Sequence, residues 1–388
     1  MLLRCAFAAR AQCAATAHRS RRCLASAAAT APEHIPVLLQ ETVALWGGAN
    51  SSSESKSRVR YFVDGTAGFG GHSRALLEHY DDAQLLCIDR DPEVLAIARA
   101  NLHDFHGRVT FQQGSYADIR VHLEAADFPR QVDGIMVDLG ANSFHFDQPH
   151  RGFSWMHDGP LDMRFDQSND DVPTAAHVLN THSEVQLTKI FKEFGEEKLA
   201  KEFAKAVVRD REEKGVVFKT TQDLKLCIER IARRWSNDSS KASSSLKGNK
   251  KSNLTTATKS KTHPATRCFQ ALRIYVNQEL QHVEEGIHEL INCLAPGGRL
   301  ATIAFHSLED RPIKTLFRKL DKQGRQDDDE DEYDVFDDES DEDDDDEEPI
   351  ETKRFHLAKR KAIKPTADEM SRNARSRSAR LRCLERIE

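Results

Sequence analysis

Short runs of apolar, β-branched and aromatic residues alternate with amphipathic segments through the first third of the chain. Strands are expected at these runs: 61–64, 84–89, 109–112, 134–138 and, much later, 299–305. Helices are expected where apolar residues recur at helical spacing: 72–80 and 92–104, the second with Asp91 as N-cap and Pro92 in its first turn. This alternation predicts an α/β fold, Rossmann-like and doubly wound, with a mostly parallel sheet.

The alternation then stops, and helical patterns follow one another without a strand. Ser183 and Gln186 have the spacing of a capping box, and Gly195 and Gly215 indicate helix ends. Four successive helices do not continue a strand–helix repeat. The block 166–235 is therefore expected to be an inserted all-helical domain that binds the substrate.

Two low-complexity stretches interrupt the pattern. Residues 236–262 are rich in Ser and Lys and have no hydrophobic period, so they are expected to form a disordered, flexible loop. Residues 326–349 are dominated by acids and are expected to form a disordered insertion. This acidic insertion is interpreted either as a solvated loop or as a mimic that competes with RNA for a basic surface.

The α/β pattern returns after each stretch. A long amphipathic helix is expected within 264–294, before the strand at 299–305. FHLAKRKAIKPT and ARLRCLERI predict two last strands around a polar turn. The α/β core is therefore expected in three parts: 32–165, 263–325 and 350–388.

The charge of the chain is unevenly distributed. The 388 residues carry a formal net charge of −7. Residues 327–348 hold 18 acids among 22 residues, and without these 18 the remainder carries +11. A basic body with a separate acidic segment indicates a polyanion-binding protein.

The first 31 residues contain five Arg, many Ala and Ser, and no acid. That composition is typical of an organellar transit peptide, here expected to be mitochondrial rather than plastid, with a location in the matrix. An N-terminus that is merely disordered is the alternative. No apolar run is long enough for a membrane span. The eight cysteines include no CxxC pair, so neither a metal site nor a disulfide framework is expected.

The stretch VDGTAGFGGHS follows the first expected strand. It fails as a dinucleotide fingerprint, because Ser73 stands where the third glycine belongs, and it fails as a P-loop for lack of a lysine. What remains is an acid, Asp64, and a turn containing Gly68, Gly70 and Gly71 that opens a helix. Such a turn lets the backbone approach a ligand closely without holding a phosphate, and adenosylmethionine enzymes use this arrangement. A purely structural turn is the alternative.

Two further acids end expected strands. Asp89, in CIDRDP, has the position of an acid that binds ribose hydroxyls. Asp138 ends the fourth strand, and the carboxyl ends of strands in a doubly wound sheet form the ligand crevice. Asp138 is therefore expected where a cofactor meets its substrate, with a turn or N-cap acid as the alternative.

Several ordered segments together carry a specific resemblance. The chain resembles the RsmH (MraW) family, adenosylmethionine-dependent methyltransferases of cytosine N4 in small-subunit ribosomal RNA, and with its N-terminal segment the mitochondrial branch of that family. The resemblance runs from about residue 33 to 386 and rests on EHIPVLLQETV, VDGTAGFGGHSRALL, CIDRDP, GIMVDLGANS, RGFSWMHDGPLDMRFD, FGEEKLAKEFAKAVV, HPATRCFQALRIYVNQEL, LAPGGRLATIAFHSLEDR and NARSRSARLR. It implies a class I methyltransferase fold with an inserted helical domain.

The resemblance also implies a cofactor site for S-adenosyl-L-methionine. Its residues are the turn and strand-end positions Asp64, Gly68, Gly70, Gly71, His72, Asp89, Tyr116 and Asp138. The family's valine-serine-serine after Asp-Leu-Gly is Ala141-Asn142-Ser143 here, and His145 takes the position of a glutamine that touches the cofactor. His145 can still hydrogen-bond.

The expected chemistry is alignment of the amine with the methyl donor and acceptance of a hydrogen bond from the amine. Asp138, Asn142 and His306 are the catalytic candidates, with a structural histidine as the alternative for His306. Substrate RNA is expected to contact arginines and aromatic residues of loop 151–165 and one arginine of the long helix expected within 264–294. These residues are Arg151, Phe153, Trp155, Arg164 and Arg267. That loop is otherwise one folded back on the core, and Arg267 and Arg273 either face the crevice or pair with acids.

Three functions compete at this point. The first is methylation of ribosomal RNA, with the assembling small ribosomal subunit as partner. The second is a ribosome-assembly factor that keeps the fold and binds RNA with little catalysis, which the changes at Ala141, Asn142 and His145 allow. A nicotinamide oxidoreductase is disfavoured by Ser73 and by the full set of motifs. A monomer and a homodimer are both compatible with the sequence.

Overall fold

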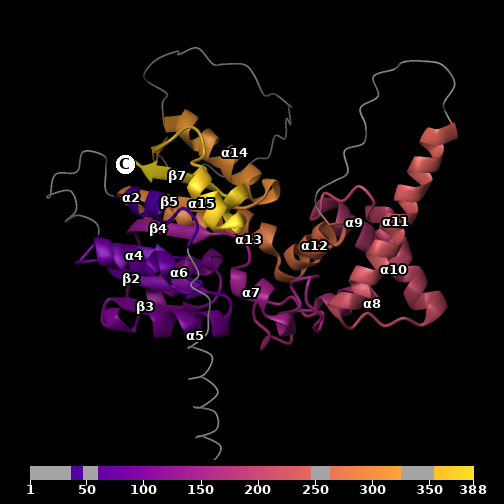
Figure 1. Cartoon of the computed structure of the whole chain (residues 1–388). Coiled ribbons are helices and arrows are strands. Elements are labelled where there is room, and N and C mark those ends of the chain that lie inside the picture. Colours follow the sequence, from indigo (N-terminus) through magenta and orange to yellow (C-terminus); the bar gives the residue numbers. More distant parts are fainter. Residues whose placement is uncertain (1–35, 47–59, 246–262, 325–353) are drawn as a thin grey trace, which may run out of the picture.

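The computed structural model describes residues 36–46, 60–245, 263–324 and 354–388 (Figure 1). The segment expected to be a transit peptide, the acidic insertion and most of the Ser/Lys-rich stretch lie outside the described residues. Within the described residues, no helix has the length and apolar character needed to cross a membrane. These residues also hold no cluster of His, Cys, Asp or Glu suited to a metal ion.

A seven-stranded sheet forms the centre of the larger unit, in the order β3-β2-β1-β4-β5-β7-β6. Strands β1 to β5 are mutually parallel, while β7 runs antiparallel to both β5 and β6. Their bounds are β1 Tyr61–Asp64, β2 Gln84–Asp89, β3 Val109–Gln113, β4 Val132–Asp138, β5 Leu294–Ala304, β6 Phe355–Leu357 and β7 Arg380–Arg386. The α/β fold with a mostly parallel sheet is confirmed, and so are all five expected core strands, with β5 beginning earlier than expected.

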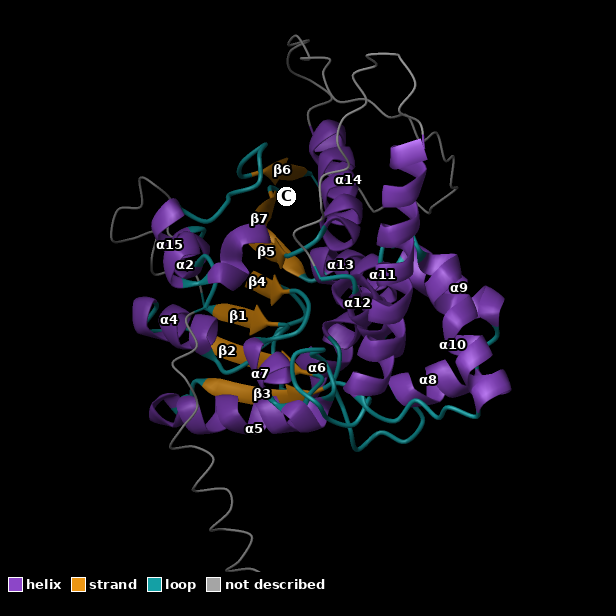
Figure 2. Cartoon of the chain, turned by 45° about the vertical axis from the view of Figure 1, so that its right-hand side comes forward, coloured by secondary structure: helices purple, strands orange, loops and turns teal. Residues whose placement is uncertain are grey.

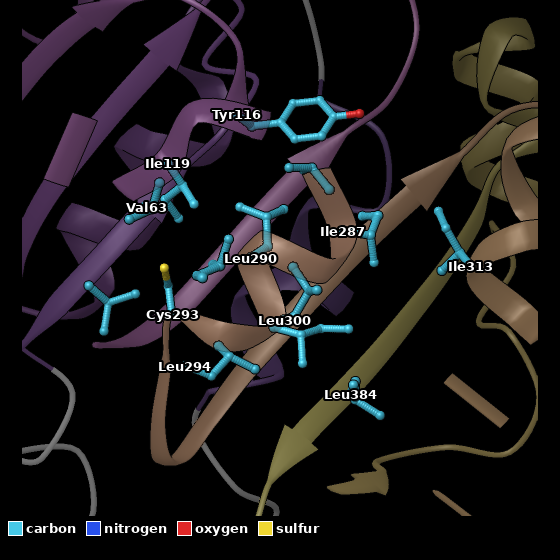
Figure 3. Close-up of a cluster of buried hydrophobic side chains, with 14 of the residues drawn as sticks. Val63, Tyr116, Ile119, Ile287, Leu290, Cys293, Leu294, Leu300, Ile313 and Leu384 are labelled. Atoms are coloured by element: carbon cyan, nitrogen blue, oxygen red, sulfur yellow. The ribbon is translucent and has the colours of Figure 1, made fainter. Parts of the chain in front are cut away.

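Apolar residues on both faces of the strands explain the layers. On one face, Val63, Ile135 and Leu300 belong to a buried cluster with side chains of α6 (Ile119–Ala125), α13 (Glu279–Asn292) and α14 (Ser307–Gly324). Figure 3 shows this cluster, with Tyr116 at its edge. On the other face, Phe62 and Leu85 pack with α4 (Gly71–His79), α5 (Pro92–Asn101) and the segment around α2 (Leu39–Ala44). A sheet covered by helices on both faces needs such continuous apolar strands (Figure 2).

A separate helical unit lies beside the sheet (Figure 1). It contains α8 (Ala175–Thr181), α9 (Glu184–Glu193), α10 (Ala200–Lys214) and α11 (Thr221–Ser245), so four successive helices are confirmed. The capping box of Ser183 and Gln186 forms, and Gly215 ends α10 in the left-handed conformation. The unit has its own buried cluster, which includes Phe191, Phe203 and Leu224.

Two expectations for the helices need correction. The flexible loop expected over 236–262 is wrong for residues 236–245, because α11 continues to Ser245, and its remainder lies outside the described residues. The single helix expected within 264–294 is two helices, α12 (Ala265–Asn277) and α13, separated at Gln278 with φ of 52°. The break lets the two halves serve different cores. The apolar face of α12 packs in the cluster of the helical unit, whereas that of α13 packs on the sheet.

The C-terminal segment closes the sheet. Both expected last strands exist as β6 and β7, but the connection between them is more than a polar turn. It contains α15 (Ala367–Arg372) and the 3₁₀ helix η4 (Ala374–Ser378). Glu369 of α15 accepts a hydrogen bond from the backbone N–H of Leu38 at 2.8 Å. The two ends of the described chain therefore meet on one side of the sheet.

Candidate active site

A cavity of about 520 Å³ opens at the carboxyl ends of β1, β2, β4 and β5. This volume is within the range of roughly 300–1,000 Å³ that small-molecule sites occupy. Its wall is drawn from the whole chain, from Pro36 before α2 to Arg375 in η4. Thr266, Phe269 and Arg273 of α12 complete the side that faces the helical unit. The crevice expected from strand-end acids therefore exists, and the helical unit contributes to it.

The glycine turn between β1 and α4 forms one wall. Gly68 has φ of 54°, which an L side chain rarely adopts, and its N–H donates to Asp89 Oδ2 at 2.8 Å. At Gly71, a Cβ would come within 2.3 Å of Pro36 Cγ, so glycine permits the N-terminal segment to cover the turn. Gly70 caps α4 and does not reach the cavity wall.

Asp64 lies behind the turn and not on the cavity wall. Its side chain is fully buried, accepts a hydrogen bond from the Ser73 hydroxyl at 2.6 Å and another from Thr66 N–H at 3.2 Å. Burial raises its pKa to about 6, although both hydrogen bonds act in the opposite direction. The expected cofactor contact by Asp64 is therefore replaced by a structural role, since the residue holds the shape of the turn.

Asp89 does lie on the cavity wall. Its carboxyl accepts hydrogen bonds from Gly68 N–H and from Asp91 N–H, the second at 2.9 Å. Burial raises its pKa to about 7 despite these bonds, because the neighbouring carboxyls of Asp91 and Asp64 add to the effect. The carboxyl is fixed at the end of β2 and retains lone pairs toward the cavity.

Asp138 ends β4 on the same wall. Its Oδ1 atom is buried and has no hydrogen-bond partner among the described residues, while Oδ2 lies 3.8 Å from His72 Nε2. Its backbone N–H donates to the Thr66 hydroxyl at 2.6 Å, which links the ends of β1 and β4. Burial raises its pKa well above the ordinary value, and Asp64 and Glu309 contribute to the increase. A buried carboxyl oxygen without a hydrogen-bond partner in the protein indicates a binding site for a ligand.

Tyr116 and Asn142 also lie on the wall. The Tyr116 ring is buried against α13, where a Cβ on Gly286 would lie 2.5 Å from it. Asn142 caps α7 (Ser143–Asp147), and its side-chain oxygen accepts from His145 N–H at 3.2 Å. The Asn142 oxygen therefore retains one lone pair for a substrate amine.

His145 borders the cavity, but both of its ring nitrogens are engaged. Nδ1 accepts from Asn142 N–H at 3.2 Å, which places the proton on Nε2, 2.8 Å from Asp91 Oδ2. Burial lowers its pKa, although Asp91 acts in the opposite direction. The expected hydrogen bond from His145 to a cofactor is therefore not available, and the ring contributes shape alone.

Arg151 differs most from expectation. Its side chain is 1% exposed, and Nη1 lies 2.7 Å from Asp91 Oδ2. Nη2 donates to the backbone carbonyls of Arg164 and Phe165. Arg151 therefore cannot contact RNA phosphate, because its guanidinium is buried and fully directed into the protein. Phe153 is likewise buried, stacked on His145 with ring centroids 4.9 Å apart.

The other side chains expected to contact RNA are engaged by groups within the protein. Arg164 forms a two-point pair with Asp162, and Arg267 donates to the carbonyl of Glu196 at 2.8 Å. Trp155 lines the cavity but stacks on His263, with ring centroids 3.9 Å apart. Loop 151–165 thus combines both interpretations. Part of it folds back on the protein, and its centre around Trp155 borders the cavity.

Polar residues from α12 and α14 were missed as site residues or left undecided. Arg273 both faces the cavity and forms a two-point pair with Glu279. His306 lies on the wall after β5, with Nε2 2.9 Å from Glu309 Oε1. The spacing of His306 and Glu309, three residues apart at a helix start, is the signal in the sequence that would have identified Glu309.

The hydrogen-bond acceptors on the cavity wall fit a cationic nucleoside. Asp89 offers acceptors for ribose hydroxyls, and Asp138 offers a buried oxygen without a partner in the described part of the chain. A positive charge beside Asp138 would favour its ionised form. The negative charges of a pyrophosphate would instead be repelled by the carboxyls of Asp89 and Asp138. These residues fit S-adenosyl-L-methionine, with its ribose and sulfonium, and disfavour a dinucleotide.

Comparison with known proteins identifies the family of the chain. The MraW methylase family matches residues 31–387. "Ribosomal RNA small subunit methyltransferase H" of Shewanella pealeana is 36% identical over 356 residues, covering 92% of this chain and 97% of its own length. The same-named protein of Shewanella baltica is also 36% identical, with 92% and 98% covered.

Among solved structures, a putative rRNA-methylase from Clostridium thermocellum aligns over 91% of this chain and 99% of its own, with a TM-score of 0.36 and 9% identity. Family membership rests instead on the sequence match, which spans nearly all of the chain. The chain belongs to the MraW methylase family, and it is a methyltransferase whose cofactor is S-adenosyl-L-methionine.

Proposed function

We propose that this protein methylates the N4 amine of a cytosine in small-subunit ribosomal RNA of mitochondria. The relatives named as small-subunit ribosomal RNA methyltransferases support the class of substrate. The observation that carries the proposal is the buried, unpartnered oxygen of Asp138, beside the cap residue Asn142 at one end of the cavity. Two acceptors at this point suit a substrate with an N–H group.

The exocyclic amine of cytosine is a weak nucleophile, because its lone pair is conjugated with the ring. The cofactor, when bound, supplies an electrophilic methyl group. The protein's contribution is to orient the amine and to accept its hydrogen bond as positive charge develops on nitrogen. Asp138 and Asn142 supply the acceptors, and aromatic residues form part of the cavity wall.

Exposed cations on a connection that reaches the cavity wall support an RNA substrate. The connection between β6 and β7 contributes Asn373 and Arg375 to the cavity wall. The same connection carries six further exposed cations: Lys359, Arg360, Lys361, Lys364, Arg372 and Arg377. Its only acids among the described residues are Asp368 and Glu369. A concentration of cations next to the site suits the phosphates of a structured RNA.

Cofactor affinity is expected to depend on pH through Asp89. Its ionised carboxylate is the better acceptor for ribose hydroxyls, and its pKa is about 7. The affinity should therefore fall as the pH is lowered through 7, by about tenfold between pH 8 and pH 6. Calorimetric titration of wild type and Asp89→Asn at both pH values checks this, since ionisation of the ligand itself is common to both proteins. An unchanged pH dependence in Asp89→Asn would remove Asp89 from the ribose site.

The proposed activity is tested with labelled S-adenosyl-L-methionine and small ribosomal subunits that lack the modification. Label is expected in the RNA, at N4 of one cytosine, as mapped by nuclease digestion and mass spectrometry. Transfer to another base, or to ribosomal protein, would refute the proposed substrate. For the mitochondrial location, the chain fused at its C-terminus to a fluorescent protein should enter the organelle, and loss of residues 1–31 should prevent entry.

A second function, an assembly factor with weak catalysis, is supported by one observation. Both ring nitrogens of His145 are occupied within the protein, so a contact that the family makes with its cofactor is lost. The labelling experiment distinguishes the two functions. Binding of small subunits without transfer of label favours the assembly factor.

A further inference from the structure

His306 and Glu309 form a polar pair at the cavity wall, where β5 meets α14. Nε2 of His306 lies 2.9 Å from Glu309 Oε1. Glu309 Oε2 accepts a hydrogen bond from the Phe305 N–H at 2.9 Å, so the carboxylate is held at both oxygens. The acid is 1% exposed, whereas 18% of the His306 side chain remains exposed. The pair is thus anchored at Glu309, with His306 facing the cavity.

Glu309 is ionised in this environment. Burial alone would raise its pKa, but His306, Arg273 and the Phe305 N–H outweigh burial and lower it. Arg273 Nη2 lies 3.9 Å from Glu309 Oε1, while Arg273 is itself fixed by its two-point pair with Glu279. On the neighbouring strand the pKa of Asp138 is raised. Two acids driven in opposite directions at one site indicate distinct roles in proton transfer.

An ionised carboxylate at Nε2 determines the tautomer of His306. It favours a proton on Nε2, which leaves the lone pair on Nδ1. Both ring nitrogens are buried and neither forms a regular hydrogen bond within the described segments, so Nε2 meets Glu309 as a close charged contact and Nδ1 has no acidic neighbour. Since Asp138 pairs with Ile303 on β5, three residues before His306, the two side chains emerge from adjacent strand ends. His306 and the carboxyl that is expected to orient the amine therefore belong to the same cavity wall.

We propose that His306 accepts the proton released by the substrate amine, and that Glu309 is the positioning residue that holds the imidazole ready to accept it. The proposal deepens the proposed function and rests on it. The amine nitrogen forms a bond to the methyl carbon, the carbon–sulfur bond breaks with its electron pair remaining on sulfur, and the nitrogen loses one proton. That proton passes to Nδ1 and later to water. The carboxylate of Glu309 stabilises the imidazolium formed in between.

Asp138 is less suited than His306 to accept the proton of the amine. As the acceptor that orients the amine, it is the group beside the developing positive charge and is most useful when ionised. A proton retained on Asp138 would remove that acceptor for the next cycle. His306 lies on the cavity wall and can take the proton away from that acceptor.

The test uses single-turnover methyl transfer with full-length protein, saturating cofactor and unmodified small subunits. His306→Ala is expected to lower the rate by about 100-fold and Glu309→Gln by about tenfold, with the dissociation constant for the cofactor within about twofold of wild type. Because Glu309 acts through His306, the double variant should be no slower than His306→Ala. Added imidazole should increase the rate of His306→Ala, which a merely structural histidine would not allow.

A matched control exists elsewhere in the fold. His356 of β6 pairs with Asp321 of α14, with Nδ1 3.2 Å from Oδ1, and Asp321 also accepts a backbone N–H, that of Leu357. Neither residue lies on the cavity wall. His356→Ala and Asp321→Asn should leave the transfer rate within about twofold of wild type, since they remove the same kind of pair without touching the site.

The outcomes separate this proposal from the function on which it rests. If wild type transfers no methyl group, the proposed function fails and the proposal fails with it. If wild type transfers but His306→Ala remains within about twofold of it, or is slowed without any response to imidazole, the proposal alone is overturned. Folding of each variant is checked by cofactor binding, so that a slow variant that still binds cofactor is informative.

Discussion

Asp138→Asn is expected to lower the rate of methyl transfer by roughly 10³-fold. The substitution keeps the size of the side chain but removes the negative charge at the end of β4. It thereby replaces a charged acceptor beside the developing positive charge on the amine by a neutral, weaker one, and it removes a counter-charge for the cofactor. The first loss acts mainly in the transition state and lowers kcat, whereas the second acts already on the bound cofactor and weakens its affinity.

The measurement is transfer of labelled methyl groups to small subunits at saturating cofactor. Asp133→Asn is the control, because Asp133 lies at the opposite end of the same strand and accepts hydrogen bonds from Arg60 N–H and Tyr61 N–H. It makes the same chemical change on β4 but lies outside the cavity wall. Equal rates for the two variants would show that Asp138 does not take part in the reaction.

Arg151→Met is expected to destabilise the protein by about 3–5 kcal/mol. Arg151 and Asp91 are both nearly inaccessible to solvent, and their side chains pair at 2.7 Å. Removing the cation leaves the buried carboxylate of Asp91 with His145 as its remaining side-chain partner. It also leaves two backbone carbonyls of loop 151–165 without their donor. Replacement by methionine preserves most of the volume, so the effect measures the lost polar contacts.

Denaturant unfolding at neutral pH gives the change in the free energy of unfolding. Arg120→Met is the control, since Arg120 pairs with Glu289 at the surface and its side chain is 62% exposed. That variant should lose less than about 1 kcal/mol. A comparable loss in the two variants would mean that Arg151 does not stabilise the fold through its burial, and the RNA contact expected from the sequence would regain support.

The position of Arg151 also connects stability with the site. Asp91 caps α5 through the backbone N–H groups of Glu93 and Val94, and the same carboxyl holds His145 and Arg151. One acid, at the N-cap of α5, therefore orders the turn after β4 and the start of loop 151–165. Both segments border the cavity, so Arg151→Met should weaken cofactor binding even though the guanidinium does not touch the ligand.

The sequence by itself determined the α/β architecture and the edge of the sheet where the site forms. Apolar runs are buried on both faces of the sheet, and an acid that ends such a run must lie at the carboxyl edge. Asp89 and Asp138 were found in this way. The glycine turn before His72 was recognised because it lacks the third glycine of a dinucleotide fingerprint and the lysine of a P-loop. These conclusions depend only on local patterns, because strand periodicity and turn chemistry are local properties.

Only the tertiary structure decided which polar side chains face the cavity and which face each other. In the sequence, Arg151 and Arg164 resemble RNA-binding arginines, because they lie among aromatic residues in one loop. Their carboxylate partners direct them into the protein. Gln278 separates α12 from α13 because the two helices pack on different cores. The pairing of a charge depends on groups that the fold brings together, and a linear pattern carries no information on that proximity. Burial then makes the pairing obligatory, since an unpaired charge inside the protein is costly.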